Sequence, residues 1–241
     1  MPEHTFGIGL IVPSSNTVME PDFHRAFSRP GVVSTTRIFL EAVTREAETR
    51  MNRDELPLAI RLINTAAPDV VVFGCTSAGS LGGIAHDAAI CRSISEGTGA
   101  RALTVIGSVL AQLRNVRPER VAIFTPYRDD ITQSVVDCVL EGGFGVAKAA
   151  GMGLVDNREI GKVTPGEIVS FVESRYRGVN ADCVFLSCTN WRAIESIDRL
   201  QRSLGCRVLS SNQACIDEVN LLMNASFHHP DAAVGGSGLP A

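Results

Sequence analysis

Two pairs of segments in this chain resemble each other at the same separation of 113 residues. In the first pair, 69–76 and 182–189, an aspartate, an apolar run and a small residue precede a cysteine and a threonine. In the second pair, 8–13 and 121–126, a largely apolar run ends in proline. A repeat of this length predicts two copies of one α/β unit. Each copy is expected to end a buried strand with a thiol.

Short runs rich in valine and isoleucine alternate with amphipathic stretches along the chain. The central runs are apolar at nearly every position, as expected for strands buried on both faces of a parallel sheet. This alternation predicts an α/β fold with two pseudo-twofold-related halves, each a parallel sheet flanked by helices. The predicted strands are 6–12, 32–39, 69–74, 101–106, 120–125, 144–151, 181–187 and 206–210. The predicted helices are 53–66, 83–97, 107–115, 128–142, 165–177, 191–203 and 213–224.

The repeat also predicts how the chain is divided. Residues 1–112 together with 213–227 are expected to form the first half, and 113–212 the second. The segment 228–241 is rich in glycine, proline and alanine and has little periodic apolar content, so we expect a flexible tail.

The bulk properties argue against several classes of function. A net charge of −4 offers no basic surface for nucleic acid, and no apolar run approaches the roughly 18 residues of a membrane span. The seven cysteines include no Cys-x-x-Cys pair, and the N-terminus lacks the layout of a secretory signal, which predicts free thiols in the cytoplasm. The histidines do not stand at zinc spacings from the cysteines, so we expect no metal and no other cofactor.

Small polar residues follow five of the predicted strands. Because ligands of parallel sheets bind beyond the carboxyl ends of the strands, these residues predict a site for a small carboxylate. Any one of them taken alone is better explained as a helix cap, but five segments at one edge favour a site. The segments are Pro13-Ser14-Ser15-Asn16, Cys75-Thr76-Ser77, Pro126-Tyr127, Cys188-Thr189-Asn190 and Ser210-Ser211-Asn212.

Cys75 and Cys188 differ from the other cysteines because each stands between a strand and the start of a helix. At such a position the helix dipole and free backbone N–H groups stabilise a thiolate, so we expect a lowered pKa. A thiolate placed there can abstract a proton or add to an electrophilic carbon. The remaining cysteines are interpreted as small buried hydrophobic residues. They are Cys91, Cys138, Cys183, Cys206 and Cys215.

Several segments combine with the two cysteines into a known pattern. They are 9–17 followed by Met19-Glu20, 125–127, 156–161 with 165–167, and 186–188. With these segments the chain resembles the aspartate/glutamate racemase superfamily, and within it the branch of maleate cis–trans isomerases and arylmalonate decarboxylases. The resemblance covers most of the chain.

The resemblance implies a homo-oligomeric pseudo-twofold protein whose active site lies in the cleft between its halves. In the isomerases the thiolate that matches Cys75 adds to the double bond of maleate, and rotation followed by elimination gives fumarate. The thiol that matches Cys188 supplies and retrieves a proton. Asn16, Tyr127 and Asn157 match residues that hold the substrate carboxylates. We therefore expect a cofactor-independent isomerase of a small dicarboxylate.

Three other functions stay open. In a racemase of an amino acid, hydantoin or related acid, Cys75 and Cys188 would exchange roles as base and acid. An arylmalonate-type decarboxylase is disfavoured because those enzymes have glycine at the place of Cys75. A binding protein without chemistry is the third possibility. The polar tract Thr76–Ser80 and the pair Trp191-Arg192 depart from the isomerases and are closer to relatives such as the ectoine-utilisation proteins, which leaves the substrate open.

Overall fold

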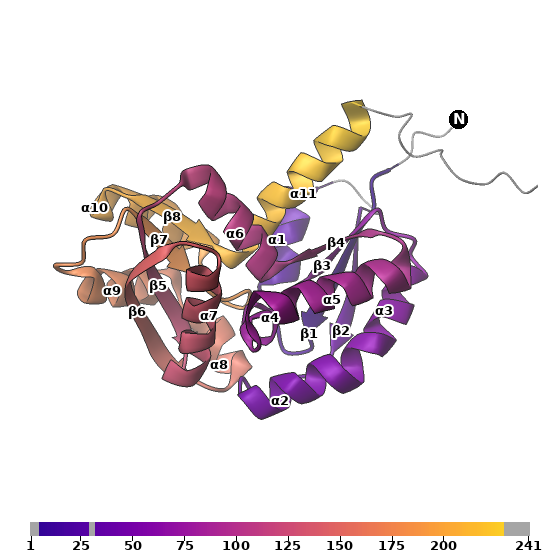
Figure 1. Cartoon of the computed structure of the whole chain (residues 1–241), viewed down its shortest axis with the longest axis horizontal. Helices are drawn as coiled ribbons and strands as arrows, with labels where there is room; N and C mark the ends of the chain where they lie inside the picture. Colours follow the sequence, from indigo (N-terminus) through magenta and orange to yellow (C-terminus); the bar gives the residue numbers. More distant parts are fainter. Residues whose placement is uncertain (1–4, 29–31, 229–241) are drawn as a thin grey trace, which may run out of the picture.

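A computed structural model describes residues 5–28 and 32–228 of the chain. These residues form two four-stranded parallel sheets, and helices cover each sheet (Figure 1). The strand order is β2-β1-β3-β4 in the first sheet and β6-β5-β7-β8 in the second, so both halves share one topology. The predicted fold of two related α/β halves is confirmed. The strands are β1 Ile8–Pro13, β2 Val33–Ile38, β3 Val70–Phe73, β4 Arg101–Thr104, β5 Arg120–Tyr127, β6 Gly145–Leu154, β7 Cys183–Leu186 and β8 Arg207–Ser210.

The sequence repeat corresponds to equivalent strands in the two sheets. Ile11 of β1 pairs with Phe73 of β3, and Phe124 of β5 pairs with Leu186 of β7, which is the same register. Every residue of β1, β3 and β7 is buried, because helices cover both faces of these central strands. The edge strands β2 and β6 are only partly buried. The positions that follow β3 and β7 are therefore equivalent in space.

The helices agree with the predicted pattern except for the short ones. The segment predicted to begin at residue 53 begins earlier, because the Thr44 side chain accepts a hydrogen bond from the backbone N–H of Ala47 and caps α2. The short helices α1, α2, α4 and α8 lie outside the predicted ranges, and the helix predicted over 191–203 begins only at Ile194. The helices are α1 Met19–Ala26, α2 Arg45–Arg50, the π-helical turn η1 Met51–Glu55, α3 Leu56–Asn64, α4 Thr76–Ser80, α5 Gly83–Thr98, α6 Val105–Val116, α7 Asp129–Glu141, α8 Asn157–Lys162, α9 Pro165–Tyr176, the 3-10 turn η2 Ile194–Ser196, α10 Ile197–Leu204 and α11 Ser211–His228.

The last helix, α11, connects the two halves. It follows β8 of the second sheet directly, packs against α6 and α1, and then extends away from the body of the molecule (Figure 1). Near its start, the Asn212 side-chain amide donates a 2.7 Å hydrogen bond to the buried carboxylate of Asp22 in α1. The boundaries of the two halves stay a prediction. Residues 229–241 of the predicted tail lie outside the described residues, whereas residue 228 ends α11.

Candidate active site

Cys75 and Cys188 occupy equivalent places, two residues beyond β3 and β7 respectively. Cys75 is the N-terminal cap of α4 and has an extended backbone conformation. Both cysteines are buried, with 4% and 3% of their surface exposed. The thiols lie close enough that a negative charge on Cys188 would raise the pKa of Cys75. The fold therefore brings one thiol from each half to a common region.

The Cys188 sulfur lies beside polar hydrogens. The backbone N–H of Asn190 donates to it at 3.2 Å, and the buried phenol of Tyr127, at the end of β5, lies close enough to lower the pKa of Cys188. Hydrogen bonds of this kind favour the thiolate form of a cysteine. The arrangement suits a group that gives up and takes back a proton.

Burial has the larger effect on both thiols. It raises the pKa of Cys188 to about 12, and it raises the pKa of Cys75 well above its ordinary value, to which the nearby Glu48 carboxylate adds. The expectation that the helix starts lower these pKa values is therefore wrong. At Cys75 loss of solvation outweighs the helix dipole, because α4 is a helix of only five residues and the sulfur lies inside the protein. At Cys188 the predicted helix start is absent, because a turn follows this buried cysteine and the next helical turn begins only at Ile194.

Side chains that follow strands of the two sheets bond to one another across the halves. The Asn16 side-chain amide donates to the Thr189 hydroxyl at 3.0 Å, and Thr189 donates to the Gly74 carbonyl at 3.0 Å. The Asn190 side-chain oxygen accepts a hydrogen bond from the Thr17 backbone N–H at 2.9 Å. The predicted residues Asn16, Thr189 and Asn190 thus lie together beside the Cys188 thiol.

Asn157, the first residue of α8, joins this network from the second half. Its side-chain amide donates to the Ser15 hydroxyl at 2.9 Å, and its carbonyl accepts from the Asn190 side-chain amide at 2.6 Å. On the other side, the Thr76 hydroxyl donates to Ser211 at 3.0 Å. All of these groups except Ser15 are buried and polar, which is the setting in which carboxylates are bound by directed donors.

Three residues singled out in the sequence do not join the network. Ser14 is exposed, and its hydroxyl accepts a 3.4 Å hydrogen bond from the Leu40 backbone N–H. Trp191 is fully buried and packs edge-on against Phe171, so its ring belongs to the core of the second half. The Arg192 guanidinium is paired with Glu195 at 2.8 Å on the surface.

Glu48 of α2 is a residue that the sequence did not indicate. Its side chain is fully buried, and its Oε1 accepts a hydrogen bond from the hydroxyl of Ser77, next but one to Cys75. Within the described residues, Oε2 has no hydrogen-bond partner. Burial raises the pKa of Glu48 to about 8. A carboxyl group with such a pKa beside a thiol can exchange protons near neutral pH.

The pKa of Glu48 predicts how stability depends on pH. Between about 4.5 and about 8 the folded protein holds a proton on Glu48 that the unfolded chain has lost. Stability therefore falls as the pH rises through this window, by at most about 1.4 kcal/mol per pH unit, and changes no further above it. Urea unfolding of wild type and Glu48→Gln at about pH 5 and about pH 8 measures this contribution. The free energy of unfolding of Glu48→Gln, relative to that of wild type, should be more favourable at about pH 8 than at about pH 5. An unchanged difference between the two proteins would contradict the raised pKa of Glu48.

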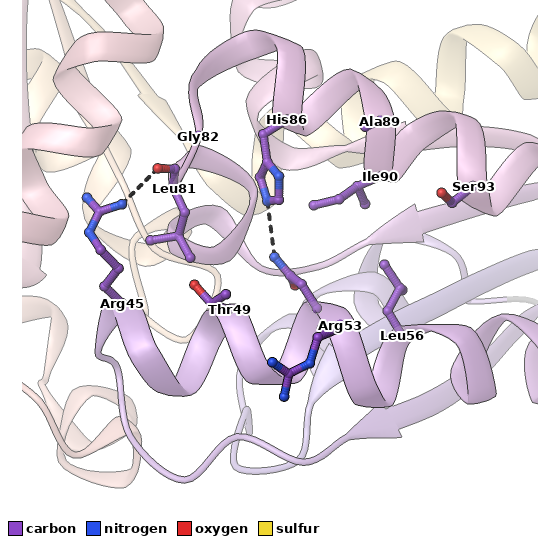
Figure 2. A pocket seen from close by; sticks show the side chains of 11 residues that line it. Arg45, Thr49, Arg53, Leu56, Leu81, Gly82, His86, Ala89, Ile90 and Ser93 are labelled. Carbon is purple, nitrogen blue, oxygen red and sulfur yellow. Dashed lines mark hydrogen bonds between the residues drawn. The ribbon is translucent and has the colours of Figure 1, made fainter.

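A cavity of about 470 Å³ lies between α2, η1 and α5, on the side of α2 that carries Thr49 (Figure 2). Asn52 of η1 donates to the Ala78 carbonyl at 3.0 Å and lies 3.3 Å from His86 Nε2. None of the residues that line this cavity is a predicted site residue. Over residues 5–28 and 32–228 there is no cluster of metal-ligating side chains and no helix long and apolar enough to cross a membrane.

Comparison with known proteins identifies relatives of this chain. The family model for arylmalonate decarboxylase matches residues 8–234. The maleate isomerase of Geobacillus stearothermophilus is 28% identical over 241 residues, which cover 94% of this chain and 95% of that protein. The maleate cis–trans isomerase of Nocardia farcinica bound to TRIS has the same fold, with a TM-score of 0.85 and 24% identity over 91% of this chain and 92% of that one.

A second structure of the Nocardia farcinica enzyme is a variant with one cysteine replaced by serine, and it holds a covalently bound succinylcysteine intermediate. Its TM-score is 0.83, with 24% identity over 92% of this chain and 94% of that one. The family model spans nearly the whole of this chain, both sheets included. The chain therefore belongs to the arylmalonate decarboxylase family, in the branch of the aspartate/glutamate racemase-like superfamily that also contains the maleate isomerases.

Proposed function

We propose that this protein is a cofactor-independent cis–trans isomerase of a small dicarboxylate and converts maleate to fumarate. Cys75 acts as the nucleophile and Cys188 as the proton donor and acceptor. The observation that carries the proposal is the meeting of two buried thiols, from equivalent positions of two related halves, among amide and hydroxyl side chains. A purely structural cysteine pair would need no such surrounding donors.

The proposed reaction uses covalent addition to make rotation possible. The Cys75 sulfur bonds to one alkene carbon, and the alkene electron pair moves to the other carbon and its carboxylate as an enediolate. Cys188 gives a proton to that carbon and later takes it back. The former double bond is now single and rotates. Re-formation of the enediolate then expels the sulfur, restores the double bond in the trans geometry and returns the Cys75 thiolate.

Directed donors stabilise the charge that develops in this scheme. We assign Asn16, Tyr127 and Asn157 to the substrate carboxylates, supported by Ser15, Thr76, Ser77, Thr189 and Asn190. Donors already held in place by the fold stabilise an enediolate without a metal. Asn16 and Asn157 currently donate to Thr189 and Ser15, so the substrate exchanges these internal hydrogen bonds for its own. Because both sulfurs are buried, substrate entry also requires the site to open.

The relatives support this assignment over decarboxylation. The Nocardia farcinica variant holds a succinyl group on cysteine, which is the intermediate expected when a thiol adds to maleate. Arylmalonate decarboxylases resemble this chain as well, but the first of the two cysteine positions is glycine in them. The presence of Cys75 at that position favours the isomerase.

One observation favours a racemase of an amino acid, hydantoin or related acid as the second candidate. An ammonium or amide N–H of such a substrate needs an acceptor, and the Glu48 carboxyl has an unpartnered oxygen close to both thiols. In that reaction Cys75 and Cys188 would remove and deliver protons on opposite faces of one carbon.

Incubation of the purified protein with maleate distinguishes the two candidates. We expect the alkene proton signal of maleate to be replaced by that of fumarate in the NMR spectrum. Absence of this conversion, together with loss of optical activity of an L-amino acid or a hydantoin, would replace the proposal with the racemase. Absence of both activities, with retained ligand affinity in Cys75→Ser and Cys188→Ser, would leave a binding protein.

We propose in addition that the protein works in the cytoplasm as a homo-oligomer. The seven cysteines support a reducing compartment, because all of them are free thiols in the structure. The oligomeric state rests on the resemblance to the isomerases. Light scattering of the purified protein measures it directly.

A further inference from the structure

Three side chains connect the Cys75 thiol to a buried carboxyl group. The Cys75 sulfur lies 3.7 Å from the Ser77 hydroxyl oxygen, and Ser77 donates its hydroxyl proton to Glu48 Oε1. A hydroxyl group has only one proton to donate. When Glu48 is ionised and accepts the Ser77 proton, the contact between Cys75 and Ser77 has the thiol as donor and a lone pair of the Ser77 oxygen as acceptor. All three side chains are buried, so the connection excludes bulk water.

No ion pair explains why Glu48 is buried. Among the described residues, no cation lies within ion-pair distance of its carboxyl group. The nearby Arg45 donates instead to the Leu81 carbonyl and the Ser134 hydroxyl, each at 2.8 Å. A fully buried, unpaired carboxyl group with an unpartnered oxygen is unfavourable for folding. Groups that persist at such a cost are concentrated at functional sites.

We propose that Glu48 accepts the proton of Cys75 through Ser77 and so generates the thiolate nucleophile. In this step the S–H bond breaks as its proton bonds to the Ser77 oxygen, while the original Ser77 proton passes to Glu48 Oε1. The products are a Cys75 thiolate and a neutral Glu48 carboxylic acid, so one negative charge moves from oxygen to sulfur. Glu48 does not touch the reacting carbon; it acts through Ser77. The proposal rests on the proposed function only in taking Cys75 as the reactive thiol.

The surroundings of Glu48 set the pH at which this exchange occurs. Burial raises the pKa of Glu48 most, and Asp130 of α7 adds to this, whereas the hydrogen bond from Ser77 and the charge of Arg45 in α2 lower it. The other titratable neighbours are Cys75, Cys188 and Tyr127, whose raised pKa values keep them protonated near neutrality. With a pKa of about 8, Glu48 is the group whose ionisation determines when the Cys75 proton can be accepted. The reactivity of Cys75 should therefore rise up to about pH 8 and then level off, whereas an unassisted buried thiol would keep rising.

The transfer of the Cys75 proton through Ser77 to Glu48 is called the relay below. Alkylation with iodoacetamide tests the relay without any substrate. The full-length protein is alkylated from about pH 6 to about pH 10, and mass spectrometry of the peptides gives separate rates for Cys75 and Cys188. The Cys188 rate reports opening of the site, and its change in a Glu48 variant measures the direct electrostatic effect of Glu48 on a neighbouring thiol. In Glu48→Gln, which keeps the hydrogen bond from Ser77, we expect the ratio of the Cys75 rate to the Cys188 rate to fall by about 10²-fold near pH 7.5. The levelling at about pH 8 should disappear.

Further variants keep the relay distinguishable from simple electrostatics. If Glu48 only repels the thiolate, Glu48→Gln will react faster at Cys75, and the relay is overturned. Ser77→Ala keeps the carboxyl group and removes the bridge, so it should also react slowly, and it decides the matter alone if Glu48→Gln does not fold. Asp87→Asn is the matched control, because Asp87 is another buried carboxyl group with an unpartnered oxygen, and it should react like wild type. If maleate is not converted but the variants show the predicted slow alkylation of Cys75, the result counts against the proposed function and leaves the relay intact.

Discussion

Replacement of Cys75 by alanine is expected to lower kcat for the conversion of maleate to fumarate by about 10⁴-fold or more. Without the sulfur no covalent bond to the alkene forms, and the double bond keeps its barrier to rotation. The surrounding donors, among them Asn16 and Asn157, are untouched, so maleate should still bind. NMR measurement of fumarate formation and calorimetric measurement of maleate binding separate the two effects.

Cys138→Ala provides the matched control for this experiment. Cys138 is also buried, but its sulfur contacts the Ser80 carbonyl at 3.7 Å from within α7. We expect this variant to retain turnover, whatever it loses in stability. Turnover of Cys75→Ala within tenfold of wild type would exclude Cys75 as the nucleophile. Equal loss of activity in both variants would indicate that the fold, rather than the thiol, had been damaged.

The Cys188→Ser variant is expected to accumulate a covalent succinyl group on Cys75 in the presence of maleate. The enediolate is basic enough to take its proton from the serine hydroxyl or from water, but a serine alkoxide is too scarce near neutral pH to remove that proton again, so elimination stalls at the succinyl adduct. The related Nocardia farcinica variant, in which serine replaces one cysteine, holds such an intermediate. Mass spectrometry of the denatured protein should show the addition of one maleate per chain, and peptide mapping should place it on Cys75.

The double variant Cys75→Ala, Cys188→Ser is the control for adventitious modification. It keeps the remaining cysteines, of which Cys91 and Cys206 are the partly exposed ones, and should gain no mass. A succinyl group found on either of those residues would mark a surface reaction. Fast turnover by Cys188→Ser without any adduct would contradict the role of Cys188 in proton transfer, because some other group would then retrieve the proton from the intermediate.

Much of the fold could be predicted from the sequence because the central strands are unusually uniform. In β1, β3 and β7 every residue is buried, so the apolar runs coincide with the strands. The helices α1 and α8 were missed because they are short and rich in polar residues. The side chain of Asp156 caps α8 by accepting a 2.8 Å hydrogen bond from the Arg158 backbone N–H. An aspartate marks the start of this helix in the sequence, but a helix of six residues is too short to show a periodic apolar pattern.

The active site was predictable only where strand order determines it. Cys75 and Cys188 follow equivalent strands, so the repeat was enough to pair them. Glu48 gave no such signal. It stands in Arg45-Glu46-Ala47-Glu48, which reads as the solvated face of a helix, and only tertiary packing places it beside Ser77. The pKa of the thiols was mispredicted for the same reason, because the cost of desolvation depends on neighbours that are distant in sequence.

The position of α11 has a consequence for biosynthesis. Asp22, in the first helix of the chain, is paired with Arg25 of the same helix, but its other oxygen accepts from Asn212, which leaves the ribosome only after both sheets have been translated. The earliest part of the nascent chain thus stays incompletely packed until the end of synthesis. We expect the finished molecule to melt in one cooperative transition in calorimetry. The reason is that α11 follows β8 of the second sheet and packs against α1 and α6, so unfolding of either half removes contacts from the other.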